Sequence, residues 1–243
     1  MRIDVLTLFP NMFNSPFAES IVKRGIDEGK ISLEYHNIRD FSQNKHNKVD
    51  DYPFGGGEGM LMQAEPVDLS IKKVKNEKSK IIYLTPSGKL LNQNIVKSLS
   101  EEEHLILLCG HYEGIDQRVL DKHEVMEISI GDYVLTGGEI PAMVLIDSIS
   151  RMIPGVLPKE DSFKNESHYS GLLEHPQYTR PRVYEKREVP KVLLSGNHKE
   201  INKWCLYKSI EKTYKIRPDM LNNKILSKEE KEMLDDIKAK DTL

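Results

Sequence analysis

Polar side chains lie between two glycine-marked turns in the run from Cys109 to Pro141. The run opens where the apolar segment Leu105 to Leu108 stops at Cys109-Gly110, and it closes where a second apolar segment, Ile128 to Leu135, stops at Gly137-Gly138. An apolar run bounded by glycine is typical of a buried strand that ends at a turn. In open α/β sheets, ligands bind outside the carboxyl ends of the strands, so the run predicts a ligand site, although two ordinary turns would give the same pattern. The polar residues of this predicted site are His111, Tyr112, Glu113, Asp116, Asp132 and Tyr133.

A glycine-rich loop at Gly55 to Gly59 does not fit the known phosphate-binding motifs. A Walker A loop ends in Gly-Lys-Ser or Gly-Lys-Thr, whereas Met60 follows the last glycine here. A dinucleotide-binding loop follows a strand directly, whereas the polar run Asp50 to Pro53 precedes this one. A substrate-contacting loop and a structural turn therefore both stay open.

Metal and cysteine chemistry are not indicated by the sequence. The eight histidines form no HExxH motif and no cluster with cysteine, so we expect no structural zinc site. The two cysteines, Cys109 and Cys205, form no CxxC pair, which fits free thiols in a reducing cytoplasm. Cys109 is predicted to be a core residue rather than a nucleophile.

Length and composition indicate a globular protein with one large or two smaller domains. The chain has 243 residues, of which 38% are hydrophobic and 30% are charged. No apolar run approaches the roughly 20 residues that span a bilayer, so no membrane association is expected. The apolar stretch at the amino terminus is too short for a signal peptide, and we predict a cytoplasmic location.

Basic residues are concentrated in one segment of a mildly acidic chain. The whole chain has 35 basic and 38 acidic residues, for a net charge of −3, but the segment from Gly171 to Asp219 has eleven basic residues against six acidic ones. The basic residues of the segment are Arg180, Arg182, Lys186, Arg187, Lys191, Lys199, Lys203, Lys208, Lys212, Lys215 and Arg217. A basic face is what a nucleic-acid partner requires, although solvated helix surfaces give the same count.

Strand-like and helix-like periodicities alternate along the first 158 residues. Strands are predicted at Ile3–Phe9, Ile31–Ile38, Lys80–Pro86 and His104–Cys109, and helices at Phe13–Gly29, Ala64–Val74, Leu90–Leu99, Ile115–His123 and Ala142–Met152. A turn is expected at Pro86-Ser87-Gly88. Such alternation predicts an α/β domain with a largely parallel sheet.

A change of character near Pro158 predicts a second domain. Residues 159–170 are polar and have no periodicity, which indicates a linker. Helices are predicted beyond it, at about His198–Tyr214 and at Ser227–Lys240, and Ser227 with Glu230 matches a capping box. We therefore expect a first domain over residues 1–158 and a small, mainly α-helical domain over residues 171–243.

Several long blocks of sequence, in order from residue 6 to residue 221, resemble the bacterial tRNA (guanine-N1)-methyltransferases. The blocks are LTLFPNMF, PFGGGEGMLM, YLTPSG, CGHYEGIDQRV, EISIGDYVLTGGEIPAM, SRMIPGVL, EDSF, GLLEHPQYTRP, VPKVLLSGNH and RPDML. The family modifies the guanosine just 3′ of the anticodon, at tRNA position 37. The resemblance implies an α/β fold of the SPOUT class, whose chain threads a trefoil knot, an exception to the rule that chains are un-knotted.

The resemblance also implies that S-adenosylmethionine binds in the knot, between three loops. Exposed backbone groups after Gly110 and around Gly131 are expected to hydrogen-bond adenine and ribose, while Gly137, Gly138 and Pro141 leave room for a bent methionine arm. The implied cofactor-binding residues are Tyr83, Leu84, Thr85, Pro86, Gly110, Tyr112, Ser129, Ile130, Gly131, Asp132, Tyr133, Val134, Leu135, Gly137, Gly138 and Pro141.

Asp161 and Arg151 occupy the positions of the family's catalytic residues. Methylation of guanine N1 requires removal of the N1 proton while O6 gains negative charge, so a carboxylate can act as general base and a guanidinium can stabilise the oxyanion. Asp161 is therefore expected to be the base and Arg151 the partner of O6, with Glu113 helping to orient the base or the methyl donor. The family also implies a magnesium ion, for which Glu113 is the one candidate carboxylate, and we expect no separate metal site.

The resemblance implies an obligate homodimer that binds tRNA. The linker of one subunit would close over the cofactor of the other, and the basic carboxyl-terminal segment would grip the tRNA. The sequence departs from the family pattern at His111, where many relatives have arginine, and at Glu58 and Ser87; the first change could weaken a cation contact to RNA. A non-catalytic RNA-binding protein of the same fold would lack Asp161 or Arg151, and a ribose methyltransferase of the class would lack the GLLEHPQYTRP block.

Overall fold

The computed structural model of the chain describes residues 1–158 and 166–241. The chain divides into two compact units, Met1–Glu160 and Asp161–Leu243, which are called unit 1 and unit 2. Residues 159–165 of the predicted linker lie outside the described residues. The rest of the predicted linker belongs with unit 2, because Ser167 Oγ accepts a hydrogen bond from Glu174 N at 2.9 Å and the Ser170 carbonyl accepts one from Lys224 at 3.0 Å.

Unit 1 is built on a parallel sheet, as the alternation of strands and helices predicts. Its described strands, in spatial order, are β2 (Ser32–Asn37), β1 (Arg2–Thr7), β6 (His104–Cys109), β5 (Ser79–Leu90) and β7 (Met126–Ser129), and every neighbouring pair is parallel. Every residue of β6 is buried, which explains its uninterrupted apolar run between two covered faces. A short antiparallel pair, β3 (Asp50–Asp51) and β4 (Leu61–Met62), flanks the glycine-rich loop.

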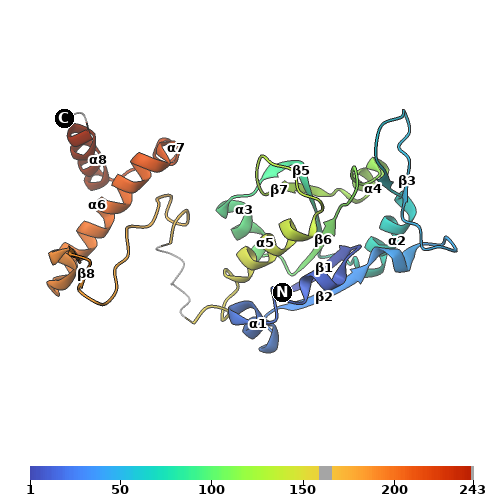
Figure 1. Ribbon diagram of the computed structural model, residues 1–243, viewed down its shortest axis with the longest axis horizontal. Coiled ribbons are helices and arrows are strands. Elements are labelled where there is room, and N and C mark those ends of the chain that lie inside the picture. The colour runs from blue at the N-terminus through green and yellow to red at the C-terminus, as the bar shows by residue number, and fades with distance from the viewer. Residues whose placement is uncertain (159–165, 242–243) are drawn as a thin grey trace. The chain divides into compact units, whose positions relative to one another are not determined.

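Helices cover both faces of the sheet (Figure 1). One apolar core lies under α1 (Ser20–Asp27), α3 (Gln93–Ser100) and α5 (Glu139–Ser150), and the other lies under α2 (Ala64–Val74), α4 (Gln117–His123) and the 3-10 helix η2 (Ile38–Phe41). Alternate residues of each strand feed the two cores, so that Ile3 and Val5 enter the first core while Leu6 enters the second. The α/β fold with a mostly parallel sheet is confirmed.

The first predicted helix is wrong over its first half. The sequence pattern predicts a helix over Phe13–Gly29, but the structure has the 3-10 helix η1 (Pro10–Phe13), then turns, and a helix only from Ser20. Pro16 lacks an amide hydrogen and disfavours helical geometry in the residue before it. The spacing of the apolar residues alone does not reveal that interruption of the helix.

One turn prediction and one strand prediction also need correction. The turn expected at Pro86-Ser87-Gly88 is instead an irregularity inside β5, where the pairing with β7 shifts register between Leu84 and Lys89. The apolar segment Ile128 to Leu135 is not a strand over its whole length, because β7 ends at Ser129. The following loop turns Val134 outward with 81% of its surface exposed.

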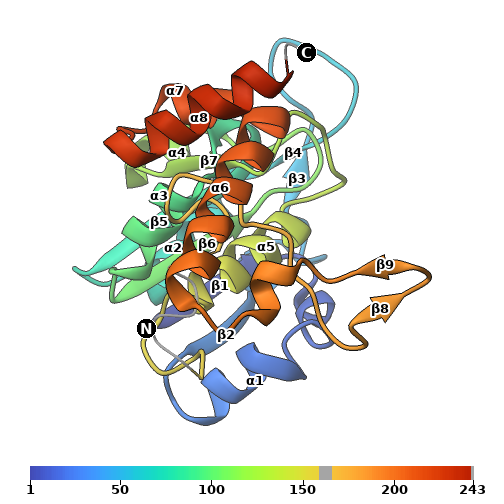
Figure 2. The same ribbon diagram turned by 90° about the vertical axis from the view of Figure 1, so that its left-hand side faces the viewer.

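Over its described residues, 166–241, unit 2 is helical with one small hairpin (Figure 2). Its helices are η4 (Lys191–Leu194), α6 (His198–Ile216), α7 (Pro218–Asn222) and α8 (Lys228–Asp241), and β8 (Val183–Tyr184) pairs antiparallel with β9 (Arg187–Glu188). Leu172, Leu221 and residues of α6 and α8 form its core. The predicted capping box is confirmed, because Glu230 N donates to Ser227 Oγ at 3.2 Å and Ser227 N donates to the Glu230 carboxylate at 2.7 Å.

Candidate active site

A cavity of about 260 Å³ lies at the carboxyl ends of β5, β6 and β7 in unit 1. Its lining comes from three segments that are far apart in the sequence, residues 83–86, 110–114 and 128–141. This is the place where parallel α/β sheets bind ligands, because the loops that leave neighbouring strands meet there. The cavity lies close to the lower end of the size range of small-molecule sites, about 300 Å³.

Close backbone contact draws the second and third segments together. Gly138 N donates a hydrogen bond to the Gly110 carbonyl at 2.9 Å. A Cβ atom on Gly138 would lie 2.7 Å from the Cα of Cys109, so no larger residue fits at this position without moving the backbone. The glycine turns that mark the sequence are thus the points at which the loop after β7 passes against the end of β6.

The segment after Gly110 is held in a strained conformation by the end of the glycine-rich loop. Tyr112 has φ of +59°, in the left-handed region that a bulky residue rarely adopts. Glu113 N donates to the Met60 carbonyl at 2.9 Å, and Met62 N donates to the Gly114 carbonyl at 2.9 Å. Backbone hydrogen bonds therefore attach the end of the glycine-rich loop to one wall of the cavity. Phe54, just before the loop, is 99% exposed.

The structure brings almost all of the predicted cofactor residues together around this cavity. The described lining residues among them are Tyr83, Leu84, Thr85, Pro86, Gly110, Tyr112, Ser129, Ile130, Gly131, Tyr133, Val134, Leu135, Gly137, Gly138 and Pro141. Asp132 is exposed and does not line the cavity. Tyr133 N bonds back to the Gly131 carbonyl at 2.9 Å, which places Asp132 at the outer apex of a three-residue turn.

Sequence reasoning did not assign His111, Gly114, Ile128 and Thr136 to the cofactor, although they also line the cavity. For His111, Gly114 and Thr136 the available signal was their position between the two glycine-marked turns, whereas Ile128 belonged to a predicted strand. Asp116, one of the polar residues of the predicted ligand site, instead caps α4 by accepting a hydrogen bond from Arg118 N at 3.0 Å.

The predicted catalytic residues are not all brought to this cavity. Glu113 lines it. Arg151 follows the last residue of α5, a helix that begins at the cavity with Glu139, so it lies about 15 Å further along the helix axis than Pro141. Asp161 lies outside the described residues.

A buried carboxylate lies behind the cavity wall. Glu139 is 2% exposed and accepts a hydrogen bond from Thr7 Oγ1 at 2.6 Å, and its other oxygen is 2.8 Å from His111 Nε2. Burial, together with the nearby charge of Glu139, raises the pKa of the Cys109 thiol well above its usual value. Cys109 is fully buried, so its prediction as an inert core residue is confirmed.

Another titratable cluster lies on β1, β2 and β6, with Asp4 and His104 in the amino-terminal halves of their strands and His36 near the carboxyl end of β2. The Asp4 carboxylate is fully buried and bonds to Arg2 at 2.7 and 3.0 Å, to His36 at 2.6 Å and to His104 at 2.6 Å. Burial alone would raise the pKa of Asp4, but the hydrogen bonds from Arg2, His36 and His104 outweigh it and hold that pKa below its usual value.

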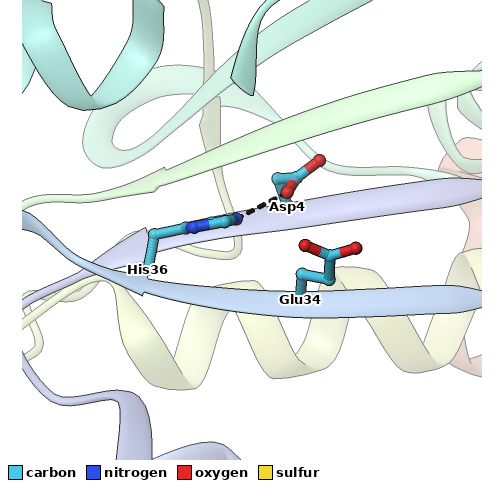
Figure 3. A group of neighbouring side chains, drawn as sticks. All are labelled: Asp4, Glu34 and His36. Carbon is cyan, nitrogen blue, oxygen red and sulfur yellow. Dashed lines mark hydrogen bonds and ion pairs between the residues drawn. The ribbon is translucent and has the colours of Figure 1, made fainter. Parts of the chain in front are cut away.

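Figure 3 shows Glu34 and His36 on the strand next to Asp4, and these three residues offer ligand atoms within 4.8 Å of one another. The Arg2 guanidinium already pairs with Asp4 and lies 3.8 Å from Glu34, so a cation of the protein itself fills this role. The Asp4 and Glu34 carboxylates are thus charge-paired by Arg2, and the cluster gives no support for a metal site.

The fold is that of an α/β protein with a parallel sheet, and a cavity close in volume to small-molecule sites lies at the carboxyl ends of its strands. Residues 1–223 match the family model described as tRNA (Guanine-1)-methyltransferase TrmD, and the chain therefore belongs to this family. A methyltransferase of this family implies S-adenosylmethionine as the methyl donor. No helix in the described ranges, 1–158 and 166–241, is long and apolar enough to cross a membrane.

Several curated relatives match nearly the whole chain. A tRNA (guanine-N(1)-)-methyltransferase of Alkaliphilus oremlandii is 54% identical over 248 residues, which cover 99% of this chain and 100% of the relative. One of Ruminiclostridium cellulolyticum is 56% identical over 225 residues, covering 91% of this chain and 97% of the relative. One of Clostridium novyi is 55% identical over 236 residues, covering 97% of each chain.

Proposed function

We propose that the protein transfers a methyl group from S-adenosylmethionine to N1 of the guanosine 3′ of the anticodon, at tRNA position 37. Family membership over residues 1–223 supports the reaction class. The observation that carries the proposal is the cavity at the carboxyl ends of β5, β6 and β7, because three separate segments converge there with the residue types that a nucleoside ligand needs.

The lining fits S-adenosylmethionine. Leu84, Leu135 and Pro141 offer apolar surface for a purine, and the glycines leave backbone groups free to approach polar atoms of the ligand. When bound, the cofactor supplies an electrophilic methyl group on a positively charged sulfur. The Glu113 carboxylate on the cavity wall complements that charge.

Asp161 would remove the N1 proton, and Arg151 would stabilise the negative charge that develops on O6. Glu113 would orient the base or the methyl donor. The cavity has no ligand set for magnesium, because Glu113 is the one carboxylate among the described residues that line it and Mg²⁺ takes about six oxygen ligands. We assign no step to that ion.

A second copy of the chain would complete the site. Arg151 lies at the far end of α5 from the cavity of its own chain, which supports a homodimer in which one subunit supplies catalytic groups to the other. Exposed apolar residues near the cavity and along α5 support the same proposal, because such a surface favours a partner. They are Phe9 (42% exposed), Met12 (43%), Ile140 (48%) and Val144 (43%).

The hairpin of unit 2 supports tRNA as the substrate. Residues 179–188 are exposed throughout and include Arg180, Arg182, Lys186 and Arg187. Tyr184 is 66% exposed on the same hairpin. Basic groups beside an exposed aromatic ring suit phosphate contact and base stacking.

The trefoil knot of the family is proposed for unit 1 as well. Ser129, the last residue of β7, accepts a hydrogen bond from Leu91 N, just after β5, at 2.8 Å. Only nine residues further along the chain, Gly138 N donates to the Gly110 carbonyl, just after β6. This short connection between the ends of β5 and β6 supports threading of the chain at this point.

The direct test is methyl transfer from labelled S-adenosylmethionine to a tRNA transcript with guanosine after the anticodon. We expect transfer by the wild type, none to a transcript with adenosine at that position, and at least a roughly 100-fold lower kcat for Asp161→Ala. A folded wild type that binds S-adenosylmethionine but transfers nothing would contradict the proposed activity. Equal transfer by Asp161→Ala would leave the activity and remove Asp161 as the base.

A further inference from the structure

Three elements meet at the buried carboxylate of Glu139, directly behind the cavity. Thr7 at the end of β1 donates to one carboxylate oxygen, and His111 after β6 pairs with the other. Glu139 itself is the first residue of α5. These two hydrogen bonds, called the Glu139 hydrogen-bond pair, thus join the ends of β1 and β6 to the start of α5.

The surroundings of His111 are shaped to this pairing. A Cβ atom on Gly137 would overlap His111 Nε2 and lie 2.6 Å from a Glu139 carboxylate oxygen, so a side chain at position 137 would force the pair apart. The Phe9 ring packs edge-on against the imidazole, with ring centroids 4.8 Å apart. The His111 side chain is 18% exposed, so most of its surface is covered by the protein.

The Glu139–His111 hydrogen bond connects two cavity-lining segments, residues 110–114 and residues 137–138, and both include residues proposed to bind the cofactor. His111 leads directly into Tyr112, which has a positive φ, and Glu113. Glu139 follows directly on Gly137-Gly138. Since Tyr112 is held in an unfavourable backbone conformation, it needs a neighbouring contact that outweighs the strain.

We propose that Glu139 is a positioning residue for S-adenosylmethionine: through His111 it holds the Gly110–Gly114 wall against the Gly137–Gly138 turn in the binding geometry. This inference rests on the proposed function. Position 111 then requires a side chain that can donate a hydrogen bond to a buried carboxylate. Arginine, with its charged and branched donor group, would satisfy the same requirement.

The test measures the Kd of S-adenosylmethionine by titration calorimetry, the melting temperature, and the KM and kcat with tRNA. Glu139→Gln keeps the shape and removes the charge, and we expect the cofactor Kd and KM to rise about tenfold. The KM for tRNA, and kcat at saturating cofactor, should change less than about twofold. His111→Ala should weaken cofactor binding to a similar extent, and His111→Arg should bind within about twofold of the wild type.

The matched control is His123→Ala. His123 is buried beside a carboxylate in the same unit, 2.7 Å from Asp68, but neither residue lines the cavity. It should lower the melting temperature and leave the cofactor Kd unchanged. The double variant Glu139→Gln/His111→Ala should be no weaker in cofactor binding than either single variant, because both changes break one interaction.

Wild-type affinity in both Glu139→Gln and His111→Ala would overturn the inference, and so would an equal loss of affinity in His111→Arg and His111→Ala. If Glu139→Gln does not fold, the two His111 variants decide the question between them. A wild type that fails to bind S-adenosylmethionine would instead contradict the proposed function. Variants that bind and react like an active wild type would contradict only the role of Glu139.

Discussion

The two halves of the sheet each bury a carboxylate beside an imidazole, but they use the pair differently. Within the sheet, Asp4 is surrounded by Arg2, His36 and His104 and does not line the cavity described above. At the carboxyl ends, the partners of Glu139 within the described part of the chain are Thr7 and His111, and the cavity begins one residue away.

The difference shows how one sheet separates stability from binding. The Asp4 cluster is saturated with donors, and further charge or motion there would only weaken the core. Glu139, in contrast, has two described partners, Thr7 and His111. They lie beside Tyr112, which has a positive φ, and beside the Gly137-Gly138 turn, so these hydrogen bonds control the shape of the site. Changes in the first region should therefore alter unfolding, and changes in the second should alter affinity.

The largest expected effect is on stability, for Asp4→Asn. Removing the charge leaves His36 and His104 beside a neutral amide, and breaking a buried ion pair in this way costs about 3 kcal/mol of unfolding free energy. The Kd for S-adenosylmethionine of the folded fraction should not change. Urea unfolding and calorimetric titration check the two halves, and a tenfold weaker cofactor affinity would break the separation of the two regions.

Acid should weaken the wild type more than Asp4→Asn. The folded-state pKa of Asp4 is held below its usual value, so this group contributes stability above the unfolded-state pKa of about 3.9 and loses it as the pH falls through the folded-state pKa. The free energies of unfolding of wild type and variant should therefore converge below about pH 4. Curves that stay parallel from pH 7 to pH 2.5 would show that Asp4 is not the acid-sensitive group.

Gly138→Ala should act at the other end of the sheet. The new Cβ would meet the backbone of Cys109 at 2.7 Å, and forcing the backbone apart should cost about 2 kcal/mol of unfolding free energy and weaken cofactor binding at least about tenfold. Gly25→Ala is the matched control, since its Cβ in a helix would meet side-chain methyl groups of Val156 and Ile31, the nearest at 3.1 Å, and no backbone atom among its nearest contacts. Normal cofactor affinity in Gly138→Ala would mean that the turn is not part of the site.

The smallest effect is expected for Arg2→Met. Arg2 bonds to Asp4 from a side chain that is 43% exposed, so solvent screens the pair and its loss should cost about 1 kcal/mol of unfolding free energy. Cofactor affinity should stay unchanged. A loss as large as that of Asp4→Asn, measured in the same urea titration, would mean that the guanidinium and not the two histidines stabilises the carboxylate.

Periodicity predicted the parts of the fold that are governed by local pattern. The helix at Ala64–Val74 and the strand at His104–Cys109 have the predicted bounds, because an amphipathic face and a fully buried run are local signals. The length of β7 was not predictable in this way. Ile130, Val134 and Leu135 are apolar because they belong to a loop around a cavity, and an apolar residue that lines a site looks like a core residue in a sequence.

The location of the candidate site could be predicted, but its internal connections could not. Gly110 marked the end of β6, and Gly137 and Gly138 marked the turn before α5, and the cavity lies at both places. The link from Glu139 to Thr7 spans 132 residues and depends on the order of the strands, which no local pattern contains. His111 was placed in the predicted ligand site and does line the cavity, but its pairing with the buried Glu139 carboxylate could not be read from the sequence.

The strand order also determines how long β1 waits for its second partner strand, β6, during synthesis of the chain. β1 pairs with β2 on one side, which follows soon after it, but on its other side Arg2 lies opposite His104. At about 5–20 residues per second, the ribosome needs roughly 5–20 s between these two residues. During that time one edge of β1 has no partner strand, and Asp4 has met His36 but not His104. The first strand to be made is thus among the last to be enclosed, and a nascent chain of this protein depends on its surroundings to keep that edge from other strands.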